Sequence, residues 1–146
     1  MTTTAQIPAL PLPRLQADSA RYWEAAANDR LHLQRCASCQ AFQNLPRGHC
    51  VACGSTDMTW TPASGKATLA SFSIVHRAPS AAWRTQVPYV LALVDLAEGV
   101  RLMLNVRTAD PGSLQIGEAL EIFFEPRGDT GFKLPQARRP GESPNA

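Results

Sequence analysis

Two cysteine pairs constrain the fold of this chain more than any other feature of its sequence. Cys36 and Cys39 form one pair, Cys50 and Cys53 form the other, and ten residues separate them. A gap of two residues lets one tight turn direct two thiolates at a single ion, and two such turns complete a tetrahedral shell. Gly54 directly follows the second pair, where such a turn needs a left-handed residue. We therefore predict a structural Zn²⁺ ion bound by these four cysteines.

Other uses of paired cysteines fit this pattern less well. A thioredoxin-like redox site needs one pair beside a βαβ pattern, which is absent here. A catalytic zinc keeps one position for water, whereas four cysteines close the shell. Iron in the same four-sulfur cage stays open, because the ligands alone do not separate it from zinc. His32 and His49 are not needed as ligands, and Arg35 and Arg47 are placed to offset the negative charge of the centre.

The region before the cysteines is predicted to be an arm followed by a helix. Residues 1–17 contain three prolines and should be extended, either mobile or laid along a surface. Asp18 or Ser19 can cap a short helix that reaches about Asn28. Leu31 and Leu33 flank His32 in the alternating pattern of a short strand. The helix carries an apolar stripe that we interpret as packing residues, namely Tyr22, Trp23, Ala26 and Ala27.

Five strand-like runs follow the cysteine module, separated by turn-forming residues. They are KATLASFSIVHR, PYVLALVDLA, VRLMLNVRT, EALEIFFEP and TGFKLPQA. Without a helical crossover, five short strands predict a small antiparallel barrel or sandwich, and the OB-fold is the five-stranded member of that class. The expected organisation is mainly β, with an extended arm (1–17), a helix and ribbon (18–60), an OB-fold (61–136) and a disordered tail (137–146).

Size and charge exclude several classes of protein. A chain of 146 residues has no room for a second full enzyme domain, and a net charge of +2 is too small to drive nucleic-acid or membrane-surface binding by itself. The N-terminus lacks the pattern of a secretory signal, and no uncharged run is long enough to span a bilayer, so a cytoplasmic location is expected. Ser64 and Ser71 lack the context of a nucleophile, and His76 is interpreted as a structural histidine rather than a base.

These residues together resemble a known family. The ribbon RCASCQAFQNLPRGHCVACGS, followed by Val75-His76-Arg77, Pro88-Tyr89 and Glu98-Gly99-Val100-Arg101, is similar to the acyl-CoA-associated zinc-ribbon plus OB-fold proteins, long called "domain of unknown function 35". The resemblance covers about residues 18–136 and implies a rubredoxin-like zinc ribbon before the OB-fold. It departs from the family at Leu45-Pro46-Arg47, where two consecutive prolines are usual before the arginine.

What the resemblance implies is an accessory subunit without catalytic residues of its own. Such chains assemble with thiolase-like or ketosynthase-like proteins, or with hot-dog hydratases, into hetero-oligomers that act on acyl-CoA, including steroid side-chain thioesters. With CoA as ligand, the candidate contacts are Arg47, Trp60, His76, Arg77 and Tyr89, gathered in a cleft between ribbon and barrel. The alternative is that Arg77 pairs with a carboxylate such as Asp95, and that Arg47 only offsets the zinc–thiolate charge.

A single-stranded nucleic-acid-binding module is the rival class, because zinc ribbons and OB-folds both serve that purpose elsewhere. Such a module needs a basic groove interleaved with exposed aromatic side chains. The strand aromatics do not alternate with a basic stripe; they are Phe72, Phe123, Phe124 and Phe132. We therefore expect no nucleic-acid partner.

Overall fold

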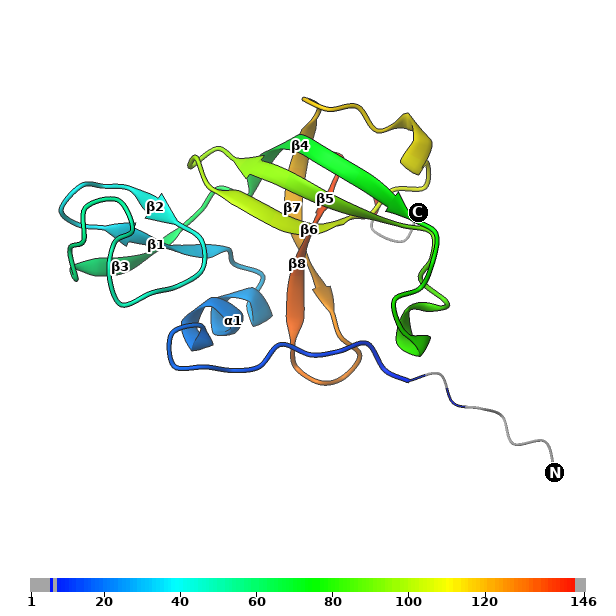
Figure 1. The fold of residues 1–146 in the computed structure, drawn as a ribbon, viewed down its shortest axis with the longest axis horizontal. Coiled ribbons are helices and arrows are strands. Elements are labelled where there is room, and N and C mark those ends of the chain that lie inside the picture. The colour runs from blue at the N-terminus through cyan, green and yellow to red at the C-terminus, as the bar shows by residue number, and fades with distance from the viewer. Residues whose placement is uncertain (1–5, 7, 144–146) are drawn as a thin grey trace.

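A computed structural model describes residues 6 and 8–143 of the chain, and it consists of one helix, a small sheet and a closed barrel (Figure 1). The predicted fold class, mainly β with an N-terminal helix and a five-stranded OB-fold barrel, is confirmed. The elements are α1 (Ala20–Ala27), β1 (His32–Cys36), β2 (Phe42–Gln43), β3 (Met58–Pro62), β4 (Lys66–Val75), β5 (Tyr89–Leu96), β6 (Arg101–Val106), β7 (Ala119–Pro126) and β8 (Lys133–Arg138), with short 3₁₀ turns at Ala81–Trp83 and Pro111–Ser113.

The barrel closes in the order β4-β5-β6-β8-β7. Strand β5 shows why the sequence forms it: Val90, Ala92, Val94 and Leu96 alternate with outward residues, and all four are buried. The first residues of the ten-residue strand β4 pair with β7 as well as with β5, and the register against β5 shifts between Leu69 and Ser71. Such an irregularity bends a strand, which a closed barrel of this size requires. A parallel pair between β6 and β8 completes the closure.

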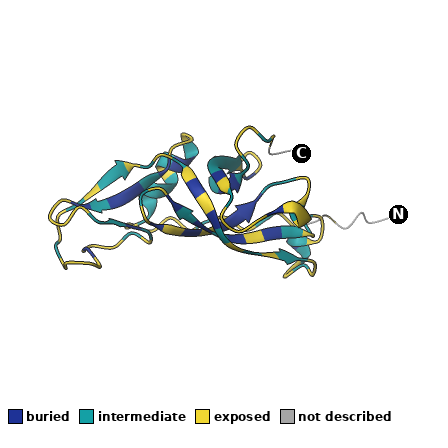
Figure 2. Cartoon of the chain, turned by 90° about the horizontal axis from the view of Figure 1, so that it is seen from above, coloured by how far each residue is buried: buried dark blue, intermediate teal, exposed yellow. Residues whose placement is uncertain are grey.

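The ribbon sheet, ordered β2-β1-β3, shares its core with the barrel. Leu31 and Leu33 lie in or beside β1, yet both belong to the buried cluster that fills the barrel. Leu33 is only 1% exposed. A polar contact also joins the parts, since Asn44 Nδ2 donates to the carbonyl of Arg101 at 3.3 Å. One buried cluster thus includes residues of both parts, and Figure 2 shows buried segments in the ribbon as well as in the barrel.

Helix α1 packs beside β8 and β1, with Ala26 of its apolar stripe buried and Tyr22, Trp23 and Ala27 half-buried. Ala26 is 1% exposed, and Tyr22 packs against the barrel core, where burial raises its pKa to about 12. The predicted side-chain cap does not form, because Ser19 Oγ instead bonds to the carbonyl of Gln16 at 3.4 Å. No helix in the described residues is long and apolar enough to cross a membrane.

Both ends of the chain differ in part from expectation. Residues 8–16 form no helix or strand, as expected for an arm, whereas residues 1–5 and 7 lie outside the described residues. At the other end, the predicted tail of 137–146 begins too early, because Ala137 is fully buried in β8 and Arg139 Nε bonds to Glu118 at 2.8 Å. Residues 144–146 of that predicted tail are not described.

The shared core predicts that Leu33→Ala destabilises the whole chain. The substitution removes a fully buried side chain and leaves a cavity, so the free energy of unfolding should fall by about 2–5 kcal/mol. Urea unfolding followed by far-UV circular dichroism and tryptophan fluorescence measures this. Leu15→Ala, at a position that is 62% exposed, is the control and should be silent. A barrel transition that stays at the wild-type midpoint would show that the two parts unfold separately.

Candidate metal centre and neighbouring clefts

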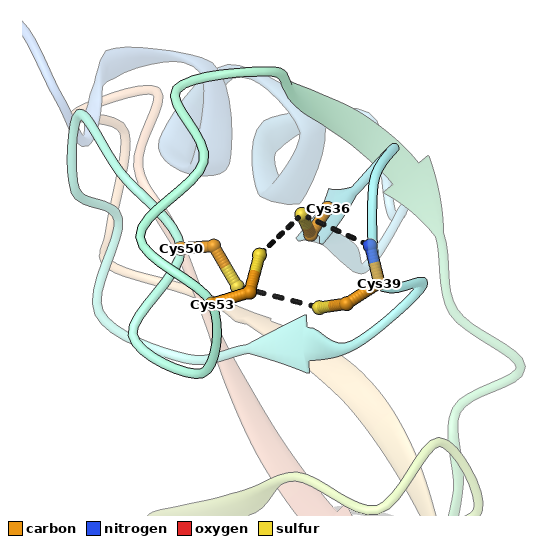
Figure 3. A group of neighbouring side chains, drawn as sticks. All are labelled: Cys36, Cys39, Cys50 and Cys53. Atoms are coloured by element: carbon orange, nitrogen blue, oxygen red, sulfur yellow. Dashed lines mark hydrogen bonds between the residues drawn. The ribbon is translucent and has the colours of Figure 1, made fainter.

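The four cysteines converge from two turns of the ribbon (Figure 3). Their Sγ atoms all lie within 4.8 Å of one another, and the Cys36–Cys53 and Cys39–Cys50 pairs are each 3.6 Å apart. A tetrahedral zinc with Zn–S bonds of about 2.3 Å separates its sulfurs by about 3.8 Å. The donor set and its spacing therefore fit one tetrahedral metal ion with little movement. Cys36 and Cys50 are buried, whereas Cys39 and Cys53 face outward.

The two turns are built alike. In the first, the Cys39 N–H points at Cys36 Sγ at 3.5 Å; in the second, the Ala52 N–H points at Cys50 Sγ at 3.4 Å. Each turn ends on a residue with positive φ that follows its second cysteine: Gln40 at 66° and Gly54 at 78°. Gly54 thus has the left-handed conformation predicted for it, while Gln40 adopts the same conformation with its side-chain amide bonded to the Ala37 carbonyl at 2.9 Å.

Backbone donors prepare two of the sulfurs as thiolates. The Cys39 N–H lowers the pKa of Cys36 to about 6, and the Cys53 N–H lowers the pKa of Cys50. At Cys53 the Ser55 N–H lowers the pKa, but the neighbouring sulfurs, led by Cys36, and loss of hydration raise it to about 12. A bound metal cation compensates the negative charge of the four thiolates. It therefore favours loss of the proton from Cys53, whose pKa is raised by the neighbouring sulfurs.

Two buried glutamines hold the second turn in place. Gln34 accepts the Arg47 N–H at 2.9 Å and donates to the Arg47 carbonyl at 3.0 Å. Gln43 donates to Gln34 Oε1 at 2.9 Å and accepts the Val51 N–H at 3.0 Å. Sequence reasoning missed both, although polar residues at inward strand positions were the available signal.

The residues flanking the centre only partly match their predicted roles. Arg35 Nε bonds to the Gln40 carbonyl at 3.2 Å, and its guanidinium lies 4.9 Å from the centroid of the Phe42 ring, so it braces the first turn. The Arg47 side chain is exposed. His32 and His49 contribute no atom to the sulfur cluster.

The predicted cleft that unites Arg47 with His76 and Arg77 does not form. The Arg47 loop lies beside Arg101, at the start of β6, whereas His76 and Arg77 follow β4 at the level of Tyr89. Because Arg101 pairs with Asp95, six residues along β5 from Tyr89, the two sets are about 20 Å apart along the barrel. Figure 1 shows the ribbon and the end of β4 on opposite sides of the molecule. The register of the barrel strands separates Arg47 from His76 and Arg77, and this register could not be predicted from the sequence.

The two predicted aromatic contacts line different clefts. Tyr89 packs against Trp83, with ring centroids 4.8 Å apart, and lines a cleft of about 970 Å³ between the barrel and the N-terminal arm. Trp60 lines a cleft of about 640 Å³ between α1 and the ribbon. The alternative in which Arg77 pairs with Asp95 is wrong, because Asp95 accepts two hydrogen bonds from Arg101, at 2.7 and 3.0 Å. Those bonds lower the pKa of Asp95.

The larger cleft has an ion cluster in its wall. Glu125 accepts two bonds from Arg107, at 2.6 and 2.7 Å, and one from Arg127 at 2.9 Å. All three side chains are mostly buried, and Arg127 Nε has no acceptor among the described residues. Burial raises the pKa of Glu125, but the two guanidinium groups outweigh it and lower the pKa overall.

A four-sulfur ribbon followed by a five-stranded Greek-key barrel defines the class of zinc-ribbon plus OB-fold proteins. The family model described as "ChsH2, rubredoxin-like zinc ribbon domain" matches residues 23–59, and "ChsH2, C-terminal OB-fold domain" matches residues 60–125. The chain belongs to this ChsH2 family, whose members are also called DUF35 proteins.

Several relatives are similar over most of the chain. The "Probable enoyl-CoA hydratase alpha subunit" of Thermomonospora curvata is 38% identical over 107 residues, which cover 73% of this chain and 33% of that protein. The "3-oxo-4,17-pregnadiene-20-carboxyl-CoA hydratase alpha subunit" of Mycobacterium tuberculosis is 36% identical over 116 residues, covering 80% and 36%. The chain thus spans about a third of the length of these two relatives. A chain of the solved "Ltp2-ChsH2(DUF35) aldolase" superposes with a TM-score of 0.79 at 34% identity, covering 88% of this chain and 99% of that one.

The convergence of the sulfurs predicts one metal ion per chain. Elemental analysis of the purified protein should find about one equivalent of zinc, or of iron, whereas Cys39→Ser and Cys53→Ser should retain less than about a third and lose solubility, because metal binding stabilises so small a module. Ser38→Ala, which changes an exposed neighbour in the first turn, should keep the metal. A folded wild-type protein with less than about a third of an equivalent would contradict the site.

The ion cluster predicts that Glu125→Gln leaves two guanidinium groups uncompensated. The free energy of unfolding should fall by about 2–4 kcal/mol, below the full cost of breaking a buried pair because Glu125 is 21% exposed. Since the folded-state pKa is lowered, this stability is present above about pH 4.3, the ordinary glutamate pKa, and is lost only as pH falls through the lower folded value.

Urea unfolding at pH 6.0 and pH 7.5 should therefore give the same difference between the Glu125→Gln variant and wild type. Glu121→Gln on the same strand, whose ion pair with Arg138 is more exposed, is the control and should cost about 1 kcal/mol or less. Equal effects of the two variants would show that burial of the cluster does not matter.

Proposed function

We propose that this chain is a non-catalytic accessory subunit that binds a thiolase-like or hydratase-like partner and helps to form a site for an acyl-CoA thioester. The similarity to the DUF35 chain of an Ltp2-ChsH2(DUF35) aldolase carries the proposal, because it extends over 99% of that chain. The two curated relatives are likewise named as alpha subunits of CoA hydratases. The pregnadiene in one of those names makes a steroid side-chain CoA thioester the first substrate to test.

The chemistry of the described residues supports an accessory role. Four cysteines fill the coordination shell, so a bound zinc would hold the ribbon together and leave no position for substrate.

The outer face of β5 and β6 offers a surface for the partner. Leu93 and Met103 lie directly opposite each other, and Leu91 is two residues away on the same face. Met103 is 70% exposed and Leu91 is 38% exposed, although outward strand positions of a free-standing barrel are usually polar. We assign this face, defined by Leu91, Leu93 and Met103, to contact with the thiolase-like or hydratase-like chain.

Co-expression with a thiolase-like aldolase or a hot-dog hydratase tests the proposal. The chain should co-purify with one of them, and aldol-cleavage or hydration of acyl-CoA should require both proteins. Met103→Glu should reduce co-purification by about tenfold, because a charge would be buried in an apolar contact. Ile116→Glu, at an equally exposed site outside the strands, should not. Turnover by the isolated chain, or elution apart from both partners, would overturn the proposal.

A further inference from the structure

The smaller cleft joins one face of α1 to one face of the ribbon sheet. Its helical residues are spaced three and four apart, so they share a single side of α1. The ribbon side is formed by β1 and β3, which pair in antiparallel fashion. At about 640 Å³, the cleft is within the range of small-molecule sites. The lining residues are Arg21, Glu24, Ala25, Asn28, Arg30, His32 and Trp60.

An aromatic wall stands on the ribbon side of this cleft. Trp60 lies opposite Gln34 in the register of β1 and β3, and His32 is two residues from Gln34, so Trp60 and His32 share one face of the sheet. Trp60 is half-buried, and neither ring-to-ring contact in the described residues involves it. Its indole is therefore available to stack against a planar ligand.

Positive charge stands on the helical side. Arg21 and Arg30 are exposed, and neither forms an ion pair in the described part of the chain. Glu24 is the one acidic residue among those lining the cleft. Asn28 donates its amide to the Glu24 carbonyl at 2.9 Å, which leaves its side-chain oxygen as an acceptor. Two free guanidinium groups beside an aromatic face suit a phosphate attached to a base.

We propose that this cleft binds a phosphorylated adenine nucleotide: Trp60 stacks on the base, and Arg21 and Arg30 bind phosphate. If the chain helps to form an acyl-CoA site, as proposed above, the nucleotide is the 3′-phosphoadenosine end of coenzyme A. Single-stranded nucleic acid presents the same chemistry, a base next to a phosphate, and is distinguished by experiment. The assignment replaces Arg47 and Arg77, which the fold separates, with arginines that lie beside Trp60.

Isothermal titration of the metal-loaded, full-length chain with coenzyme A tests this inference. Arg21→Ala and Arg30→Ala should each weaken binding by about tenfold, as loss of a charged hydrogen bond requires, and so should replacing coenzyme A by its 3′-dephospho form. Trp60→Leu should weaken all adenine ligands alike. Arg84→Ala, another exposed arginine without an ion pair but outside the cleft, is the matched control and should bind normally. Metal content and circular dichroism verify folding of each variant.

Three results would overturn the inference: no heat of binding with millimolar coenzyme A, wild-type affinity in an Arg21→Ala/Arg30→Ala double variant, or tighter binding of an oligodeoxyadenylate than of coenzyme A. The same variants should also be tested for co-purification with the partner, because this assay measures the accessory role independently of coenzyme A binding. If the double variant co-purifies normally and still binds coenzyme A with wild-type affinity, this cleft is not the binding site, but the accessory role still holds.

Discussion

The convergence of four sulfurs on one point is the constraint on which the ribbon depends. Four thiolates within 4.8 Å of one another repel strongly unless a cation compensates their charge, and accordingly the pKa of Cys36 is lowered while that of Cys53 is raised. The constraint extends beyond the ribbon because Cys36 ends the same strand whose other end supplies Leu33 to the barrel core. A metal ion that fixes the turns therefore also fixes the end of a strand that the barrel buries.

Much of this fold could be predicted because its signals are local. The cysteine spacing defines the turns, and the alternation in residues such as Val90, Ala92 and Val94 identifies strands that bury one face. Gly54 was predictable for the same reason, since a turn of this kind sets the conformation of a single residue. The loss of Ser19 as a side-chain cap is a small exception, as the preceding turn takes its hydroxyl.

What could not be predicted depends on pairing between distant strands. Arg77 and Asp95 are both near strand ends, but antiparallel register brings Arg101 rather than Arg77 to Asp95. The same register carries His76 and Arg77 away from the ribbon. The predicted start of the disordered tail was wrong for the same reason, because Ala137 pairs with Ile122 of β7 on one side and with Val106 of β6 on the other, and no local signal indicates either pair.

The arginines also explain why the smaller cleft, not the larger, is the better place for a phosphate. In the wall of the 970 Å³ cleft, Arg107 and the Nη1 atom of Arg127 already bond to Glu125 at 2.6–2.9 Å, and the unpaired Nε of Arg127 is buried. An anion that entered this cleft would compete with the buried Glu125 carboxylate for these two guanidinium groups. Its interactions there would also have to offset the cost of removing the anion from water. Arg21 and Arg30 carry no such commitment among the described residues, so a phosphate would give up only their exposed hydration. The 970 Å³ cleft is the larger, but the 640 Å³ cleft has the arginines that are free to bind an anion. For an anionic ligand the available positive charge matters more than the volume, so the smaller cleft is the better site.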